Sequence, residues 1–382
     1  MIKNQSIKFS IPKATTYLNC AYMSPILKSV EKAGVKAIAT KRNPALVSAE
    51  DFFTNTELLR KEFATLIHAK DPKRIVVIPS VSYGIANVIH NLKTNATENI
   101  IIAAEQFPSN YYPWHRLSQD TGVKIKIIQP PLELVNRGKG WNERLLEAID
   151  KNTRVVALGN VHWADGTKFD LKAIRKRTRE AGALMVIDGT QSVGALPFDV
   201  SSLQPDALVC AGYKWLMGPY SLGFAYYGEY FDQGKPIEES WINRIESENF
   251  AGLVNYRDGY QEGALRYEVG EHSNFILVPM MLEALKQINQ WKPENIQEYC
   301  KKITHAPIQK LREAGFWIED NDFRGHHLFG IRFPKTFDVE KLKMALQKNK
   351  IAVSFRGDSI RVAPHVYNQE ADLMKLVKVL TQ

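Results

Sequence analysis

Short apolar segments typical of buried strands alternate with amphipathic helical segments along the first two thirds of this chain. The expected strands cover residues 74–78, 99–103, 124–128, 154–158, 184–187, 207–210 and 223–227. Expected helices cover residues 25–41, 56–68, 141–149 and 171–181. Strands that alternate with helices over this length predict an α/β fold. We expect three layers, with a mostly parallel seven-stranded sheet between two layers of helices.

The pattern changes at about residue 255, where helices with shorter strands follow. These strands are expected at residues 329–333, 351–354 and 359–363. A chain of 382 residues is longer than one hydrophobic core commonly serves. We therefore expect a large domain at 26–255 and a smaller C-terminal α+β domain at 256–382, with residues 1–25 lining a site and packing with the small domain. Residues 228–258, which are rich in charges, form either a mobile loop or an arm between subunits.

Composition excludes several classes of function. The net charge of +9 comes from 50 basic and 41 acidic residues that are scattered, without a nucleic-acid-binding motif, so no nucleic-acid partner is expected. Cys20, Cys210 and Cys300 are far apart and lack metal-ligand spacing, which argues against a metal site or a disulfide framework and suits a reducing compartment. The first residues do not resemble a signal peptide, and no apolar run is long enough to cross a membrane. We expect a cytoplasmic protein with no membrane contact.

An acid and a lysine follow two of the expected strands. The strand at 184–187 leads to Asp188 and a glycine-containing turn, and the strand at 207–210 leads to Lys214 among small residues. A lysine amine can condense with an aldehyde, and a carboxylate can keep a pyridine nitrogen protonated, which is the chemistry that pyridoxal phosphate (PLP) requires. Taken alone, the two residues are better explained as a helix-capping aspartate and a surface lysine than as a cofactor site.

Other strand ends add groups that suit the same cofactor, because ligands of open α/β sheets bind beyond the carboxyl ends of the strands. The serine-rich turn at 79–84 opens a helix and offers a phosphate cradle with Ser82, although Ser82 could simply cap the helix. Phe107, followed by a proline, could form a flat platform for a planar ring or pack into the core. Tyr213 could reach the phosphate. The polar and aromatic segments around Asn19 and Trp163 are candidates for lining a substrate site.

Two motifs carry a resemblance to a known family. Ile-Asp-Gly-Thr-Gln-Ser-Val-Gly at 187–194 and Cys-Ala-Gly-Tyr-Lys-Trp-Leu-Met-Gly-Pro at 210–219 resemble the PLP-dependent class V aminotransferases of fold type I. That family also contains cysteine desulfurases, kynureninases and isopenicillin-N-epimerase-like proteins. The resemblance extends from residue 17 to residue 368. It implies a PLP cofactor, an α-amino acid substrate and a homodimer with a shared active site.

The resemblance also implies a role for each candidate residue. Lys214 would form the Schiff base with PLP, and Asp188 would hold the pyridine nitrogen. The remaining cofactor contacts would be Gln191 on the phenolic oxygen, Phe107 on the ring, and Ser82, Tyr83 and Tyr213 on the phosphate. Arg361 would bind the substrate α-carboxylate, near Asn19 and Trp163. The segment at 264–274 resembles one that a neighbouring subunit lends to the phosphate, but it has Glu271-His272 where many relatives have a Thr-Pro pair.

The reaction is less constrained by the sequence than the cofactor. Transamination is the first expectation, and a PLP-dependent lyase or epimerase is the alternative. Cysteine desulfurase chemistry is disfavoured, because residues 351–361, which precede and include Arg361, contain no cysteine. A non-catalytic homologue used as a binding module is a second alternative, motivated by the exchange at Glu271-His272.

Overall fold

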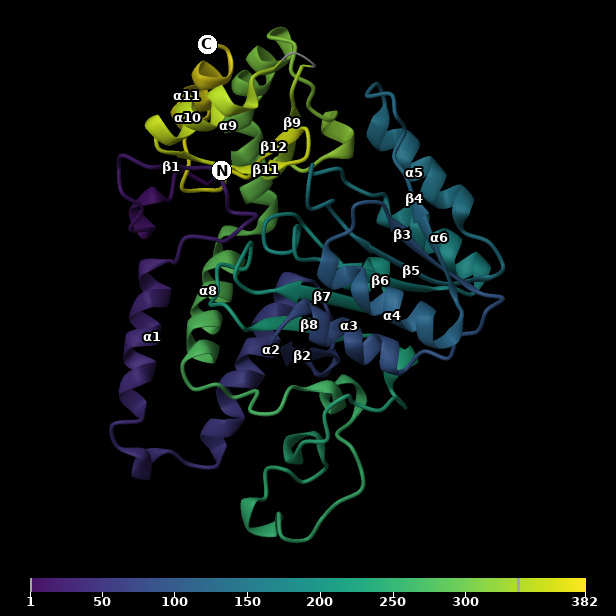
Figure 1. The fold of residues 1–382 in the computed structure, drawn as a ribbon. Coiled ribbons are helices and arrows are strands. Elements are labelled where there is room, and N and C mark those ends of the chain that lie inside the picture. The colour runs from purple at the N-terminus through teal and green to yellow at the C-terminus, as the bar shows by residue number, and fades with distance from the viewer. Residues whose placement is uncertain (1, 335–336) are drawn as a thin grey trace.

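A seven-stranded sheet forms the centre of the large domain in the computed structural model, which describes residues 2–334 and 337–382. Its strands are β2 (Ile75–Ile78), β3 (Asn99–Ala103), β4 (Lys124–Ile128), β5 (Thr153–Gly159), β6 (Leu184–Asp188), β7 (Ala207–Ala211) and β8 (Gly223–Tyr227). They lie in the order β2-β8-β7-β6-β5-β3-β4 (Figure 1). β8 runs antiparallel to both of its neighbours, and the other adjacent pairs are parallel. The predicted seven-stranded, mostly parallel sheet is confirmed.

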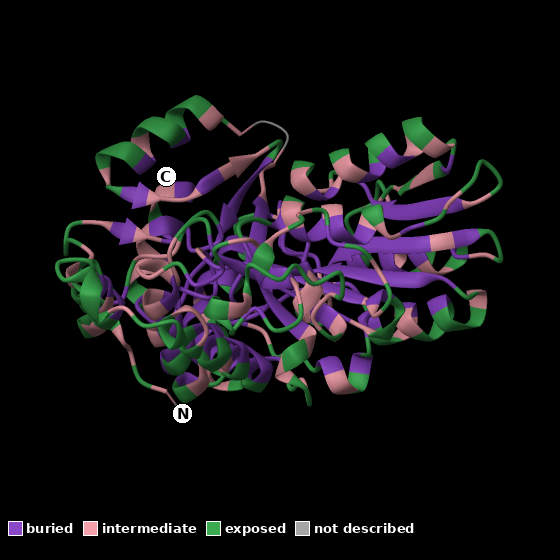
Figure 2. Ribbon diagram, turned by 90° about the horizontal axis from the view of Figure 1, so that it is seen from below, coloured by how far each residue is buried: buried purple, intermediate pink, exposed green. Residues whose placement is uncertain are grey.

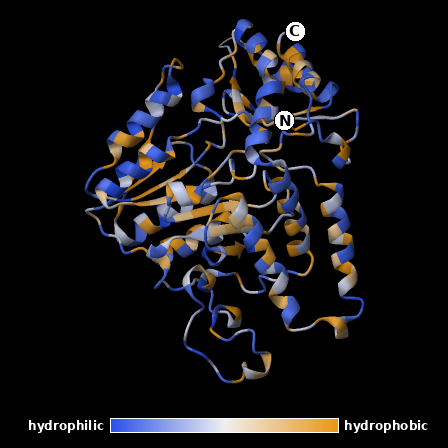
Figure 3. Cartoon of the chain, turned by 180° about the vertical axis from the view of Figure 1, so that it is seen from behind, coloured by the Kyte–Doolittle hydropathy of each residue, from blue (hydrophilic) through white to orange (hydrophobic). Residues whose placement is uncertain are grey.

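Helices cover both faces of this sheet, as predicted. On one face lie α3 (Val81–His90) and α4 (Tyr112–Thr121). On the other face lie α2 (Thr54–Leu66), α5 (Arg137–Ala148), α6 (Leu171–Ala181) and α8 (Leu277–Trp291). The central strands are buried on both faces, which explains why they are continuous apolar runs (Figures 2 and 3). The further helices α1 (Lys28–Thr40) and α7 (Val200–Leu203) complete this part of the chain, and α1 packs against α8.

The C-terminal region has a smaller antiparallel sheet in the order β11-β12-β9. Its elements are α9 (Pro293–Glu313), β9 (Phe329–Arg332), α10 (Val339–Lys348), β10 (Ile351–Ala352), β11 (Ser354–Arg356), β12 (Ser359–Val362) and α11 (Glu370–Leu380). The predicted strands are present here, but the one expected at 351–354 is divided into β10 and β11. The domain boundaries at residues 25 and 255 stay a prediction.

The N-terminal segment contributes the short strand β1 (Thr16–Tyr17), which was not predicted and which pairs in parallel with β10. Asn19 then bridges to Ala363, directly after β12. These pairings were missed because a two-residue strand is defined by its distant partner and has no local periodicity. They hold the first residues of the chain against the C-terminal region.

The chain between β8 and α8 leaves the body of the molecule as a projection of turns and short 3₁₀ segments, coloured green in Figure 1. An aromatic cluster anchors it. Phe250 and Phe275 lie 5.3 and 5.1 Å from the ring of Phe52, which precedes α2. Val254 and Tyr256 at its outer part are 80% and 96% exposed. Within residues 2–334 and 337–382, none of the helices combines the length and apolar character needed to cross a membrane.

Candidate active site

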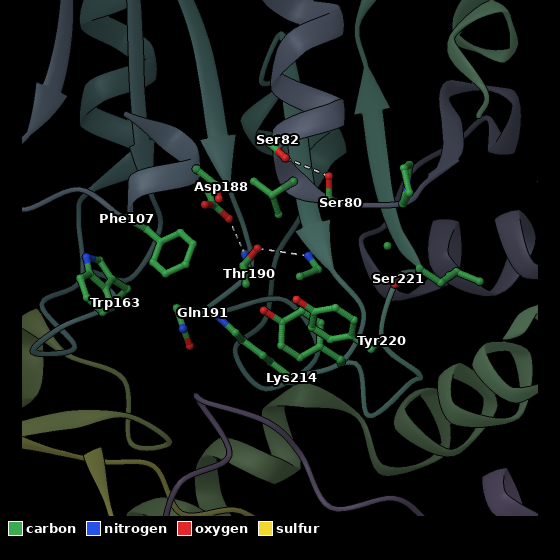
Figure 4. A pocket seen from close by; sticks show the side chains of 17 residues that line it. Ser80, Ser82, Phe107, Trp163, Asp188, Thr190, Gln191, Lys214, Tyr220 and Ser221 are labelled. Atoms are coloured by element: carbon green, nitrogen blue, oxygen red, sulfur yellow. Dashed lines mark hydrogen bonds between the residues drawn. The ribbon is translucent and has the colours of Figure 1, made fainter. Parts of the chain in front are cut away.

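A cavity of about 290 Å³ lies at the carboxyl ends of the parallel strands of the large sheet (Figure 4). It receives side chains from the loops after β2, β3, β5, β6 and β7. Its predicted members are Ser82, Phe107, Trp163, Asp188, Gln191, Tyr213 and Lys214, joined by Ser80, Val81, Ser109, Thr190, Tyr220 and Ser221. Seven candidates that are distant in sequence therefore share one cavity.

Lys214 is buried and its amine lies among aromatic rings. Nζ is 5.2 Å from the ring centre of Phe107 and 5.5 Å from that of Tyr213. Burial, with the positive charge of Arg361, lowers the pKa of Lys214 to about 8, and Asp188 opposes this shift. A substantial fraction of this amine is consequently neutral, and able to act as a nucleophile or base, near physiological pH.

Asp188 is the last residue of β6 and is also buried. Its Oδ1 accepts a hydrogen bond from the backbone amide of Thr190 at 3.0 Å, and the Thr190 hydroxyl accepts one from the amide of Ala211 at 3.1 Å. Burial raises the pKa of Asp188, whereas Thr190 and Lys214 oppose that rise. A cationic hydrogen-bond donor in the cavity would offset the cost of burying this carboxylate.

The helix α3 begins at the cavity and presents free backbone amides to it. Ser80, not Ser82, caps this helix, because its Oγ accepts a hydrogen bond from the amide of Tyr83 at 3.2 Å. Capping by Ser82, the alternative to a phosphate contact, is therefore wrong. The amides of Val81 and Ser82, at the first two helical positions, have no intrahelical acceptor. They provide a positive helix end that suits an anion such as phosphate.

Gln191 is held by hydrogen bonds from three directions. Its Nε2 donates to the carbonyl of Ala21 at 3.1 Å, and its Oε1 accepts from Nε1 of Trp215 at 2.9 Å. Its backbone oxygen lies 2.8 Å from Nε2 of His327. The side chain is thus fixed on the cavity wall by the N-terminal segment and by the loop that contains Lys214.

Three predicted residues do not line the cavity. The hydroxyl of Tyr83 donates to Oε2 of Glu238 at 2.7 Å, and Oδ1 of Asn19 accepts from Ser354 at 2.9 Å. Arg361 is buried, and its Nη1 donates to the carbonyl of Trp163 at 2.7 Å. Arg361 still influences the cavity through its charge. The roles expected for all three stay predictions.

Several residues of the site were not predicted from the sequence. Tyr220 packs on Tyr213 with ring centres 4.5 Å apart, and Ser221 adopts a left-handed φ of 63°. Thr190 lies inside the recognised motif, and its link to Ala211 becomes visible only when β6 and β7 are paired. Arg356 is the arginine of the small sheet that is closest in sequence to Arg361. It also lowers the pKa of Lys214. No local pattern distinguishes it from a surface arginine.

The segment around Glu271-His272 is anchored within its own chain. Glu268 pairs with Arg60 in the interior, and its Oε1 accepts a hydrogen bond from the amide of Val77 in β2 at 2.7 Å. His272 is buried, with Nδ1 3.2 Å from Nη2 of Arg60. The contact expected from this segment to a neighbouring subunit's phosphate stays a prediction.

The residues of the cavity fit PLP. A buried lysine amine suits its aldehyde, a buried carboxylate suits its ring nitrogen, and the open end of α3 suits its phosphate. These three groups lie around one volume, bordered by the ring of Phe107. The donor set therefore matches the three chemical features of the cofactor.

Comparisons with known proteins point to the same group. The family model Aminotransferase class-V matches residues 26–376. An uncharacterized aminotransferase, YcbU, of Bacillus subtilis (strain 168) is 28% identical over 319 residues, which cover 83% of this chain and 81% of that protein. A cysteine desulfurase of Shigella sonnei (strain Ss046) is 28% identical over 263 residues, 68% of this chain and 62% of that protein.

Solved structures confirm the fold. The cysteine desulfurase CsdA from Escherichia coli superposes with a TM-score of 0.82 at 20% identity, covering 98% of this chain and 96% of that one. The cystine C-S lyase C-DES, in complex with cysteine persulfide, superposes with a TM-score of 0.85 at 18% identity, covering 96% and 97%. At these identities, the similarity establishes a shared architecture.

Proposed function

The chain belongs to the class V aminotransferase family, whose cofactor is PLP, and we propose that it transfers the amino group of an α-amino acid. The observation that carries this proposal is the placement of Lys214 and Asp188 on one cavity with the open end of α3. A helix-capping aspartate and an exposed lysine, the alternative for these two residues, would not produce a buried amine beside a buried carboxylate.

Each residue has a physical task in this proposal. Bound PLP supplies an electron sink for the bonds at the substrate Cα. Lys214 would hold the cofactor and would move a proton to or from the substrate Cα through Nζ. Asp188 would accept a hydrogen bond from the ring nitrogen and keep it protonated. Trp215 orients the side chain of Gln191, which would contact the phenolic oxygen of PLP, and Phe107 would border the PLP ring.

Phosphate and substrate contacts complete the assignment. We assign the phosphate to Ser82, Tyr213 and the amides at the start of α3, and to Tyr83 if its hydroxyl leaves Glu238. Arg361 would bind the substrate α-carboxylate, because a planar guanidinium matches a carboxylate with two parallel hydrogen bonds. Trp163 and Asn19 would lie beside it. A homodimer with shared active sites and a cytoplasmic location are part of the same proposal.

Persulfide chemistry stays disfavoured in this proposal, although cysteine desulfurases are among the relatives. All three cysteines are buried. Burial raises the pKa of Cys20 to about 12 and raises the pKa of Cys210 and Cys300 well above the ordinary value. A thiol must ionise to act as a nucleophile, so these environments do not suit attack on sulfur.

The experiment begins with the purified protein and added PLP. Borohydride reduction should fix the cofactor on Lys214, as peptide mapping would show, and Lys214→Ala should abolish this label. The matched control is Lys151→Ala, which removes an exposed lysine and should leave labelling intact. A colourless protein that binds no PLP would overturn the proposal.

A single-turnover assay separates transamination from the alternatives. With an amino acid and no acceptor, an aminotransferase releases one equivalent of the corresponding keto acid and retains the nitrogen. A lyase would instead release a side-chain fragment, and an epimerase would return the inverted amino acid. Binding of PLP without any reaction across an amino acid panel would favour a binding module.

A further inference from the structure

Two arginines lie on one face of the hairpin formed by β11 and β12. Ser354 pairs with Arg361, and Arg356 pairs with Ser359. Side chains two residues apart on a strand point to the same face, so Arg356 and Arg361 are diagonal neighbours across the hairpin. The proposed function uses Arg361 and leaves Arg356 without a task.

Arg356 has no carboxylate partner within ion-pair distance in the part of the chain that the structure describes. Its Nη1 donates to the carbonyl of Phe355 at 2.6 Å, and its Nε is buried without a hydrogen-bond partner. The nearby Arg332 differs, because its Nη1 contacts both carboxylate oxygens of Asp358 at 2.7 Å. The charge of Arg332 is neutralised inside the protein, whereas that of Arg356 is not.

Trp163 connects Arg356 to the active-site cavity. The Arg356 guanidinium lies 5.0 Å from the ring centre of Trp163. Trp163 borders the cavity that contains Lys214. It also borders a second cavity of about 480 Å³, which Arg356 lines. The second cavity is also bordered by Arg332 and by three acidic residues, Glu105, Asp165 and Asp358. Asp165 is paired with Arg137 and Asp358 with Arg332, whereas Glu105 is exposed and only its backbone carbonyl accepts a hydrogen bond from Nε1 of Trp163, at 2.6 Å.

We propose that Arg356 binds an anionic group on the substrate side chain, so that the enzyme prefers α-amino acids with an acidic side chain. This inference rests on the proposed function and names its substrate class. Arg361 would hold the α-carboxylate while Arg356 holds the second anion, with Trp163 between the two cavities. A guanidinium without a carboxylate partner can match such an anion with two parallel hydrogen bonds.

The first test compares amino acids on the PLP-loaded enzyme. We expect kcat/KM for aspartate, glutamate or phosphoserine to exceed that for alanine. Comparing the three acids shows which anionic group and which side-chain length the enzyme prefers. Arg356→Gln should lower kcat/KM for the preferred acid by about tenfold or more, because the substrate loses a charge-assisted hydrogen bond. The effect should fall mainly on KM, and the loss should be larger for the preferred acid than for alanine.

Two variants serve as controls. The double variant Arg332→Gln/Asp358→Asn removes a neighbouring arginine together with the carboxylate that neutralises it, and should leave the preference unchanged. Arg356→Lys keeps the positive charge and should retain part of the preference for acidic substrates. Equal losses for alanine and the acidic substrates in Arg356→Gln, or a wild-type enzyme that favours alanine, would overturn the inference.

A binding measurement with compounds that carry no amino group tests this inference separately from the proposed function. Glutarate and succinate carry two carboxylates and no amine, and butyrate carries one. Tryptophan fluorescence should show tighter binding of a dicarboxylate than of butyrate, and Arg356→Gln should remove the difference. Dicarboxylate selectivity without amino transfer would overturn only the proposed function. Amino transfer without dicarboxylate selectivity would overturn only the role of Arg356.

Discussion

Oε1 of Gln191 accepts a hydrogen bond from Nε1 of Trp215 at 2.9 Å, which ties the loop after β6 to the loop after β7 beside Lys214. Both side chains are buried. The two loops also meet through their backbones, because a Cβ at Gly194 would lie 2.5 Å from the carbonyl oxygen of Trp215. Asp188 and Lys214 thus belong to one packed unit, and its contacts can be tested separately from catalysis.

Trp215→Phe should destabilise this unit. The substitution removes the donor and leaves Oε1 of Gln191 buried without its partner, at a cost of about 1–3 kcal/mol. Urea denaturation would measure the loss. Trp317→Phe is the matched control, because the Nε1 of Trp317 donates to the carbonyl of Leu134 at an exposed position. Equal losses of unfolding free energy in both variants would mean that the hydrogen bond to Gln191 contributes no more to stability than the exposed one.

Gly194→Ala should be more harmful than an alanine at another left-handed glycine. Gly194 has φ of 100° and no room for a Cβ, whereas Gly182 has φ of 70° and no atom within 4 Å of the added carbon. Gly182→Ala should therefore cost about 1 kcal/mol from backbone conformation alone. Gly194→Ala should exceed it by at least about 1 kcal/mol in thermal or urea unfolding and reduce PLP binding. Similar stabilities would show that the loops separate easily.

The large sheet could be predicted from sequence because its strands are buried on both faces. A run such as Ile100-Ile101-Ile102 needs no partner to be recognised, and the expected strands match the observed ones to within one residue at either end. Asp188 and Lys214 were found for the same reason, since each follows such a run. The PLP cofactor, the family and the fold were therefore predicted correctly.

Contacts between distant segments could not be predicted in this way. The pairing of β1 with β10 joins the N-terminal segment to the C-terminal region, and the position of Arg356 diagonal to Arg361 depends on the register of β11 against β12. The hydroxyl of Tyr83, expected on the phosphate, lies on Glu238 of the projecting segment. A single motif cannot show which of two polar partners a side chain will choose.

The pH dependence of PLP attachment should report on Lys214. Its pKa is lowered to about 8, so the reactive neutral amine accumulates as the pH rises through about 8. The rate of Schiff base formation, trapped by borohydride, should rise over the same range. Arg361→Gln removes a positive charge that lowers this pKa and should move the midpoint upward, whereas Arg361→Lys should leave it near the wild-type value. An unchanged midpoint in Arg361→Gln would contradict this electrostatic link.

Glu268 should contribute a pH-dependent part of the stability. Burial alone would raise its pKa, but Arg60 and His272, together with the Val77 amide, hold the pKa at about 2, below the ordinary 4.5. A carboxyl whose pKa is depressed in the folded state stabilises the protein above the unfolded pKa, and this stabilisation is lost as the pH falls from about 4.5 towards 2.

Glu268→Gln should accordingly lower the free energy of unfolding by about 3–5 kcal/mol at pH 7, because it leaves the Arg60 guanidinium buried without its counter-charge. The difference from wild type should shrink as the pH is lowered through 4.5. Glu246→Gln is the control, since Glu246 pairs with Arg257 at an exposed position and should cost less than about 1 kcal/mol. A pH-independent loss in Glu268→Gln would show that Glu268 acts by packing and hydrogen bonding and that its charge contributes nothing. The anchoring of residues 268–272 to β2 would then have to be explained without the ion pair.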